Sequence, residues 1–313
     1  MYKYGIISTA SITKRFITGL RFAGDEVICI GSRDIEKAKQ FANDNSISKY
    51  YGSYEEVYED KDVDIVYIPV INNLHYECAK NALLHSKNVV LEKPFTIFEE
   101  EAKELYKIAR DNNCFLFEGV KNLFVPSTEF VLNNLNKIGE VINITTKQGI
   151  KKPFEEGHWM YDITKGGGAY IGSASYVFHY LCYLFNSEVS NLDGTYMPSS
   201  NSDLICDFSF NLGNIKVNST IDMSKDLDNK CVIYGTCGKI SIDEFWRSHH
   251  VLVETNDGDK YEFNDEGNEF VYEAKHIQEC LNKGLIVSPM IQEKDSVQEV
   301  KNIRYLYKKW NLV

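Results

Sequence analysis

In about the first 120 residues, short apolar segments alternate with segments whose apolar residues have helical spacing. The apolar segments are continuous, which is typical of strands that are buried on both faces of a parallel sheet. Helices between such strands predict a doubly wound α/β sheet. The expected strands cover residues 4–8, 27–32, 64–69, 88–91 and 114–117, with a short strand near Tyr50 and Tyr51, and the expected helices cover residues 11–22, 35–43, 74–85 and 98–111.

The pattern changes after Leu123, where apolar and polar residues begin to alternate. This period of two, with turn signals such as Gly213-Asn214 and Asp257-Gly258, predicts a large and mostly antiparallel open sheet. We therefore expect a Rossmann-type domain over residues 1–121 and an α+β domain over residues 122–313. The expected strands of the second domain are 141–148, 204–211, 215–221, 231–234, 239–242, 251–254 and 260–263, and its expected helices are 127–135, 168–185, 270–281 and 295–310.

The charge balance excludes some classes of partner. The chain has 34 Lys and Arg against 45 Asp and Glu, a formal net charge of −11. Nucleic acids and anionic membranes both need basic surface, so neither is an expected partner. No apolar segment approaches the length of about 20 residues that a transmembrane helix needs. The apolar run at the start of the sequence is too short for a signal-peptide core, so we expect a cytoplasmic protein. The eight cysteines form no C-x-x-C pair and no metal-ligand spacing is present, so we expect neither a disulfide framework nor a metal site.

The turn after the first strand is the expected phosphate-binding turn of a dinucleotide fold. Its residues are Ser8, Thr9, Ala10, Ser11 and Ile12. A G-x-G-x-x-G motif would place glycines at positions 8, 10 and 13, and the chain has none of them. Small residues still permit close approach of the backbone, and hydroxyl groups can bond phosphate oxygens. A capped helix in another α/β fold remains an equal alternative from this turn alone.

The end of the second strand bears on the choice between NAD and NADP. Enzymes that use NAD usually have an acidic residue there, whereas enzymes that use NADP present a cation to the 2′-phosphate. This chain has Ser32 and Arg33, and Lys37 follows four residues later. We therefore expect NADP(H) to be preferred over NAD(H). The alternative is an ordinary solvated pair of basic side chains.

Leu91, Glu92, Lys93 and Pro94 end the fifth strand, at the sheet edge where such folds bind ligands. A lysine there can hydrogen-bond a substrate hydroxyl that loses its proton when the carbon loses hydride. The alternative is an ordinary surface lysine.

Six segments in the same order resemble the glucose–fructose oxidoreductase / inositol dehydrogenase (Gfo/Idh/MocA) family. Glu92-Lys93-Pro94 resembles the E-K-P signature of that family, and the late segment 270–289 resembles its dihydrodiol dehydrogenase-like branch. The other four are G-I-I-S-T-A-S-I at 5–12, S-R-D with Lys37 at 32–37, Y-I-P-V-I-N-N-L-H at 67–75, and G-G-G-A at 166–169.

The resemblance implies an NAD(P)-dependent oxidoreductase that acts on sugars, cyclitols, diols or related hydroxy compounds. It assigns catalysis to Lys93 and to Tyr176, whose ordinary pKa of about 10 would be lowered by a nearby cation such as Lys93. It also implies cofactor contacts from several loop residues, which are Pro69, Asn72, His75 and Glu92. His158 and Trp159, in the loop before the glycine run, could line the substrate pocket, and His179 could partly replace a missing family residue. The alternative for these three residues is a structural role in the loop and the helix.

Several positions depart from the family pattern. The aspartate expected four residues before Tyr176 is Gly172, and the arginine expected before Phe124 is Leu123; the other departures are Ser8, Ile71 and Ala174. These changes keep open a catalytically impaired dinucleotide-binding sensor or structural protein, and a relative that recycles a tightly bound cofactor. From the family and from the open sheet, we expect a homodimer or homotetramer that associates through the second-domain sheet.

Overall fold

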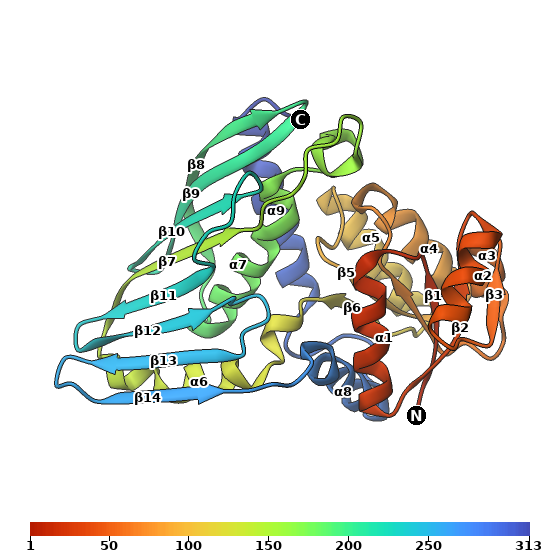
Figure 1. Ribbon diagram of the computed structural model, residues 1–313, viewed down its shortest axis with the longest axis horizontal. Coiled ribbons are helices and arrows are strands. Elements are labelled where there is room, and N and C mark those ends of the chain that lie inside the picture. The colour runs from red at the N-terminus through yellow and green to blue at the C-terminus, as the bar shows by residue number, and fades with distance from the viewer. The chain divides into compact units, whose positions relative to one another are not determined.

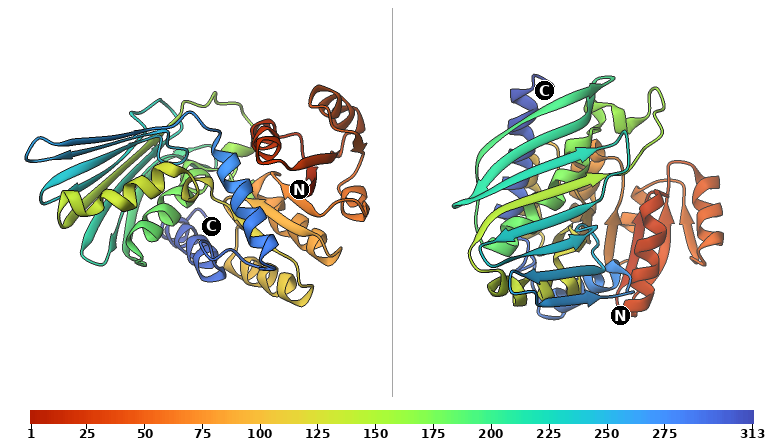
Figure 2. Two further views of the ribbon diagram at one scale, coloured as in Figure 1. Left: turned by 90° about the horizontal axis from the view of Figure 1, so that it is seen from below. Right: turned by 60° about the vertical axis from the view of Figure 1, so that its left-hand side comes forward.

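The computed structural model describes residues 1–313, which form two compact units (Figures 1 and 2). The first unit contains Met1–Gly119 and Asn268–Val300, and the second contains Val120–Gly267 and Lys301–Val313. The chain thus returns to the first unit after it has built the second sheet. Every helix is too short or too polar to cross a membrane.

The first unit is built on a six-stranded parallel sheet in the order β3-β2-β1-β4-β5-β6. The order reverses beside β1, as in the dinucleotide-binding fold. This confirms the Rossmann-type sheet expected from the sequence. Its strands are β1 (Lys3–Ile7), β2 (Glu26–Gly31), β3 (Lys49–Tyr51), β4 (Ile65–Ile68), β5 (Asn88–Glu92) and β6 (Leu116–Gly119).

The continuous apolar strands are buried because helices connect them. All four residues of β4 have 0% exposure, as a strand covered on both faces requires. The helix α3 was not expected, because it has only five residues and just two of them, Val57 and Tyr58, are buried. The helices of this unit are α1 (Ser11–Ala23), α2 (Ile35–Asp44), α3 (Glu55–Glu59), α4 (His75–Leu84), α5 (Glu99–Asp111) and α8 (Glu269–Asn282), with a short helix η1 (Asn72–Leu74).

The late helix α8 packs on α1 although the two are far apart in the sequence. The Phe16 and Phe270 rings meet edge to face at 5.5 Å between centroids. Gly19 allows this approach, since an added Cβ would lie 2.4 Å from the Cβ of Phe270. Arg15 also forms an ion pair with Glu269. The helix that follows the phosphate-binding turn is therefore fixed by a segment from the end of the chain.

The second unit contains an eight-stranded sheet in the order β14-β13-β12-β11-β7-β10-β9-β8, seen across its face in the right view of Figure 2. Only β7 and β10 pair in parallel, which confirms the mostly antiparallel sheet. The strands are β7 (Val141–Gly149), β8 (Val189–Ser199), β9 (Ser202–Leu212), β10 (Ile215–Asp222), β11 (Lys230–Gly235), β12 (Gly238–Asp243), β13 (His250–Thr255) and β14 (Lys260–Asn264).

Helices α6 and α7 lie on one face of this sheet (Figure 2, left). Phe178 of α7 packs against Phe208 and Phe210 of β9, at 5.8 and 5.3 Å between ring centroids. The apolar side of the alternating strand pattern therefore faces α7. The helical segments are α6 (Pro126–Asn134), α7 (Ala169–Phe185) and α9 (Glu293–Lys309), which runs from the first unit into the second, with the short helices η2 (Lys121–Leu123), η3 (Leu135–Ile138), η4 (Trp159–Tyr161) and η5 (Ile163–Lys165).

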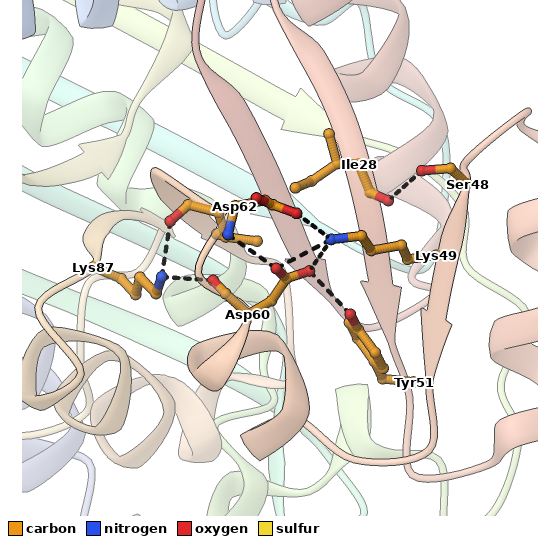
Figure 3. A network of polar contacts seen from close by, with 8 residues as sticks. Ile28, Ser48, Lys49, Tyr51, Asp60, Asp62 and Lys87 are labelled. Atoms are coloured by element: carbon orange, nitrogen blue, oxygen red, sulfur yellow. Dashed lines mark hydrogen bonds and ion pairs between the residues drawn. The ribbon is translucent and has the colours of Figure 1, made fainter.

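A polar network fixes the edge strand β3 to the start of β4 (Figure 3). The Lys49 ammonium lies 2.9 Å from Asp60 and 2.7 Å from Asp62, and the Tyr51 hydroxyl donates to Asp60 at 2.9 Å. The Lys87 ammonium donates to the Asp60 carbonyl at 2.7 Å. Lys49 begins β3, Asp62 precedes β4 and Lys87 precedes β5, so the network lies at the amino ends of the strands. Ligands bind at the opposite edge of such sheets, and we assign this network a structural role.

Replacing Lys49 with Met should destabilise the first unit. Burial raises the pKa of Asp60, but hydrogen bonds from Lys49, the Asp62 amide and Tyr51 outweigh burial and hold that pKa below its usual value. An acid with a lowered pKa stabilises the fold above its unfolded pKa of about 4 and loses this effect as the pH falls. Lys49→Met should therefore cost about 1–3 kcal/mol at pH 7 and clearly less near pH 3.

Urea unfolding of both proteins at the two pH values measures this difference. Lys39→Met, which changes an exposed lysine of α2, is the matched control. An equal loss of stability at both pH values would contradict the assignment.

Candidate active site

The turn between β1 and α1 has an unusual backbone at Ser8. This serine has a φ of +105°, in a region that L-residues seldom occupy and glycine enters freely. The Ala10 amide donates to Ser8 Oγ at 3.3 Å, and Thr13 Oγ1 donates to the Ser8 carbonyl at 3.4 Å. Ser8 therefore adopts the backbone conformation that a glycine would have in this turn, and these local hydrogen bonds support it.

The N-terminus of α1 is suited to bind a phosphate. No side chain caps this helix, whereas the Asp34 carboxylate caps α2 by accepting from the Glu36 and Lys37 amides. An uncapped first turn leaves amide N–H groups directed out of the helix, where the helix dipole favours an anion. Ser11 and Ile12 begin α1 directly after the Ser8 turn. These residues fit the pyrophosphate of a dinucleotide.

The cations expected at the end of β2 are both exposed. The Lys37 ammonium lies 3.8 Å from Asp34 and its side chain is 73% exposed. Arg33 lies beside Tyr54: burial raises the pKa of that tyrosine, and the guanidinium partly offsets the rise. Ser32 Oγ accepts from the Asp34 amide at 3.3 Å. The Asp34 carboxylate already accepts hydrogen bonds from the first turn of α2. Of the two cations, Arg33 is the one that lies nearer to the end of β2 in the sequence.

His75 joins the loop after β4 to the turn after β5. Its Nδ1 lies 2.7 Å from the Pro94 carbonyl oxygen, and its Nε2 lies 3.1 Å from the Val70 carbonyl oxygen. The ring is fully buried, and burial lowers the pKa of His75, although a protonated ring would donate to both carbonyls. His75 therefore holds the half-buried Lys93 and the cis Lys93–Pro94 peptide at the carboxyl edge of the sheet. Its predicted cofactor contact stays a prediction.

The other loop residues expected at the cofactor are buried on the same edge. Glu92, at the end of β5, accepts a hydrogen bond of 2.6 Å from the Tyr67 hydroxyl of β4. Pro69 is buried after β4, and Asn72 is 7% exposed at the start of η1. The first turn, the β4 loop and the β5 end thus share one edge of one sheet, as the sequence predicts.

In the second unit, Tyr176 has a cationic partner that the sequence did not indicate. The Lys121 ammonium donates to the Tyr176 hydroxyl oxygen at 2.6 Å and lies 4.8 Å from the centre of its ring. Both side chains are buried, at 4% and 5% exposure. Asn122, the next residue of η2, donates to the Tyr176 carbonyl at 3.4 Å. The sequence signal that could have identified Lys121 is a lysine within the otherwise mostly apolar segment from 120 to 125.

The start of α7 is held by a buried carboxylate. Asp203 of β9 accepts from the Tyr170 amide at 2.6 Å and from the Tyr307 hydroxyl at 2.8 Å. That hydroxyl in turn accepts from the Ile171 amide at 3.1 Å. Gly168 has a φ of +137°, and an added Cβ would lie 2.2 Å from the Asp203 carboxylate. The glycine run before α7 is therefore needed to bring the chain past Asp203.

The helix α7 has open space one turn before Tyr176. An added Cβ at Gly172 would meet no atom within 4 Å, although glycine inside a helix costs about 1 kcal/mol relative to alanine. Residues four apart share a helix face, so this space adjoins Tyr176 on α7. His179, three residues after Tyr176, is 5% exposed. Packing does not require the glycine at this position.

The loop before the glycine run carries the other predicted substrate residues. His158 Nδ1 accepts from the Met160 amide at 3.3 Å, and its ring lies 6.1 Å from that of Trp159. The Tyr161 hydroxyl donates to the Lys152 and Pro153 carbonyls at 3.2 Å each. His158 and Trp159 are half-buried. His158 thus begins a short helix, and its substrate contact stays a prediction.

Asp203 gives the second unit a pH-dependent stability. Burial raises the pKa of Asp203 to about 6, although hydrogen bonds from the Tyr170 amide and the Tyr307 hydroxyl oppose the rise. The folded chain then binds this proton more tightly than the unfolded chain, whose aspartate pKa is about 4. Stability therefore falls as the pH rises from about 4 to about 6, and the loss is complete above about 6.

Asp203→Asn removes this titration. The free energy of unfolding of the variant, relative to that of the wild type, should therefore rise by about 1–3 kcal/mol between pH 4 and pH 7. Denaturant unfolding at both pH values measures the change. Asp207→Asn, which removes an exposed carboxylate from the same strand, is the control. A difference in stability that stays the same at both pH values would show that Asp203 does not titrate in this range.

Comparisons with known proteins agree with this architecture. Residues 2–120 match the model of the oxidoreductase family with an NAD-binding Rossmann fold. A trans-1,2-dihydrobenzene-1,2-diol dehydrogenase from Xenopus laevis is 32% identical, over 94% of this chain and 93% of its own length.

Two solved structures share the fold at low sequence identity. A levoglucosan dehydrogenase in complex with NADH and levoglucosan has a TM-score of 0.87 at 16% identity and covers 98% of this chain and 97% of its own. A 3-ketoreductase from Actinomadura kijaniata in complex with NADP has a TM-score of 0.86 at 22% identity and covers 97% and 96%. The family match and the dehydrogenase relative place the chain among the NAD(P)-dependent oxidoreductases: it belongs to the Gfo/Idh/MocA family, in its dihydrodiol dehydrogenase-like branch.

Proposed function

We propose that the protein is an NADP(H)-dependent oxidoreductase that transfers hydride between the nicotinamide and a carbinol or carbonyl carbon of a small sugar, cyclitol or diol. The observation that carries the proposal is the buried Tyr176 of the second unit, whose hydroxyl oxygen accepts a hydrogen bond from the Lys121 ammonium. In the first unit, Lys93 follows β5 at the carboxyl edge of the sheet, where such folds bind ligands. The similarity to a diol dehydrogenase over 94% of the chain supports the substrate class.

In the oxidative direction, the carbinol C–H bond breaks and its hydrogen leaves with both electrons, while the O–H proton leaves separately and a C=O bond forms. The nicotinamide, when bound, supplies the acceptor for the hydride. Lys93 donates a hydrogen bond to the reacting oxygen and so stabilises the negative charge that develops there. Tyr176 accepts the hydroxyl proton and passes it to solvent, and in reduction it returns a proton to the carbonyl oxygen.

The first unit would hold the cofactor with backbone groups and a few side chains. The uncapped first turn of α1, with Ser8, Thr9, Ala10, Ser11 and Ile12, binds the pyrophosphate. Arg33, with Ser32 and Lys37, binds the 2′-phosphate. Pro69, Asn72, His75 and Glu92 would contact the cofactor at the carboxyl edge of the sheet.

A second candidate function rests on Gly172. If the family aspartate is needed for turnover, the protein is a catalytically impaired sensor or structural protein that still binds the dinucleotide. A third, a relative that recycles a tightly held cofactor, would keep its nicotinamide through purification and dialysis.

Single substitutions test the catalytic roles. Lys93→Met and Tyr176→Phe should each lower kcat by about 10²–10⁴-fold, because each removes a group that stabilises charge or transfers a proton in the transition state. Nicotinamide absorbance during turnover of a panel of vicinal diols, sugars and cyclitols measures the rate. Turnover that survives both changes would contradict the assignment, and tight NADPH binding without turnover of any compound would favour the sensor.

Arg33→Ala tests the preference for NADP. Loss of a charged hydrogen bond to the 2′-phosphate costs about 1.5–3 kcal/mol, so NADPH affinity should fall about 10–100-fold while NADH affinity changes little. Cofactor fluorescence titration measures both constants. Arg110→Ala is the matched control, since Arg110 pairs with Glu293 on α9. Equal weakening of both cofactors by Arg33→Ala would overturn the preference.

We also propose a homodimer or homotetramer that associates through the second-unit sheet, and a cytoplasmic location. Helices α6 and α7 pack on one face of that sheet. The other face carries Thr145, Lys147, Asp207 and Thr220 around a shallow hollow of about 560 Å³, and it is this face that we propose as the contact between subunits. None of the eight cysteines forms a disulfide, in keeping with a reducing compartment.

A further inference from the structure

We propose that Lys121 is a positioning residue for the reaction: its ammonium orients the Tyr176 hydroxyl and stabilises the negative charge that this oxygen carries between proton transfers. The inference rests on the proposed function, since it assigns the group that makes Tyr176 an effective acid and base.

The contact is directed at the atom that would exchange the proton. The Lys121 ammonium lies 2.6 Å from the Tyr176 hydroxyl oxygen. An ammonium has three donors and no acceptor, so Lys121 must donate and the phenolic oxygen must accept. The hydrogen bond therefore fixes the direction of one lone pair of the phenolic oxygen.

The surroundings make this hydrogen bond strong and well oriented. Lys121 and Tyr176 are 4% and 5% exposed, and a charge that is removed from water interacts more strongly with its neighbours. The Lys121 ammonium therefore acts on the Tyr176 oxygen at a place from which water is largely excluded.

The position of Lys121 is fixed by the backbone around it. Its neighbour Asn122 donates to the Tyr176 carbonyl at 3.4 Å, and the Asn122 carbonyl accepts from Thr128 Oγ1 at 2.6 Å. The Phe124 amide closes η2 on the Lys121 carbonyl at 3.1 Å. Two adjacent residues of η2 thus contact both the side chain and the backbone of Tyr176. This two-point contact sets the direction from which the ammonium approaches.

The Tyr176 oxygen changes its charge during the reaction, and a nearby ammonium stabilises the negative form. When Tyr176 gives its proton to a carbonyl oxygen, its own oxygen becomes negative, and before it accepts a proton from an alcohol it must already be negative. A donor that is preorganised at that oxygen favours the charged form without reorganisation. Lys121 therefore acts in both directions of the reaction through Tyr176.

The test compares four variants of the full-length protein. Lys121→Met should lower kcat by about 10–100-fold with the substrate KM and the NADPH affinity changed less than about threefold. Lys121→Arg should retain most of kcat, and added methylammonium should restore part of the kcat of Lys121→Ala. Lys137→Met is the matched control, because the Lys137 ammonium lies 4.1 Å from the Tyr261 ring in the same unit, and its kcat should stay unchanged.

A double mutant separates the action through Tyr176 from a general effect on folding. In a Tyr176→Phe background, Lys121→Met should cause no further loss of kcat, since the group on which it acts is gone. An additive loss, a rise in KM alone, or a loss that neither arginine nor methylammonium repairs would overturn the proposal and leave Lys121 with a structural role.

A readout without turnover makes failure of this proposal distinguishable from failure of the proposed function. In protein labelled with ¹³C at tyrosine Cζ, the resonance that disappears in Tyr176→Phe reports the hydrogen bonding of this oxygen. At neutral pH it should shift between the wild type and Lys121→Met, because the substitution removes the ammonium that donates to the oxygen. The same position in both would contradict the role of Lys121, whereas absence of turnover with this shift present would contradict only the proposed function.

Discussion

The second unit depends on one buried carboxylate. Asp203, with 0% exposure, receives hydrogen bonds from the first-turn amide of Tyr170 and from Tyr307, and Gly168 must lack a side chain for the chain to pass it. This contact fixes where α7 begins, and a helix that begins at a fixed residue presents each later side chain at a fixed angle. The positions of Tyr176, Gly172 and His179 follow from it.

In the first unit the main constraint is the backbone at the carboxyl edge of the sheet. Ser8 adopts a positive φ, α1 begins without a side-chain cap, and His75 connects the Val70 and Pro94 carbonyls. These features are suited to an anionic cofactor through local dipoles and hydrogen bonds. A chain with a net charge of −11 can therefore recognise a phosphate, because recognition is decided over a few ångströms rather than by the overall charge.

The sequence predicted the fold where its pattern reflects burial. Continuous apolar segments such as β4 and alternating segments such as β10 were both identified, because burial on two faces or on one leaves a distinct pattern. The strand β8 was missed, since Asn191, Asp193, Gly194 and Pro198 are residues that disfavour strands. Its partner β9 supplies the pairing that its own sequence does not indicate.

The candidate site was predicted in part, for the same physical reason. Lys93 and the first turn follow strands, so their place on the sheet edge could be inferred from order along the chain. The contact of Lys121 with Tyr176 joins residues 55 apart in the sequence, and that of Asp203 with α7 joins residues 33 apart. No periodicity encodes such contacts; only the packing of η2 and β9 against α7 reveals them.

The central claim is that this protein moves a hydride between a nicotinamide and a substrate carbon. The most direct measurement uses NADPH that carries deuterium at its transferable position, together with a ketone related to a vicinal diol or sugar, and mass spectrometry of the product. The account predicts one deuterium bound to the carbon that gains the hydroxyl group, in wild-type protein and far more slowly in Tyr176→Phe. Product that forms without deuterium, or label that stays on the cofactor with every compound of the panel, would contradict it.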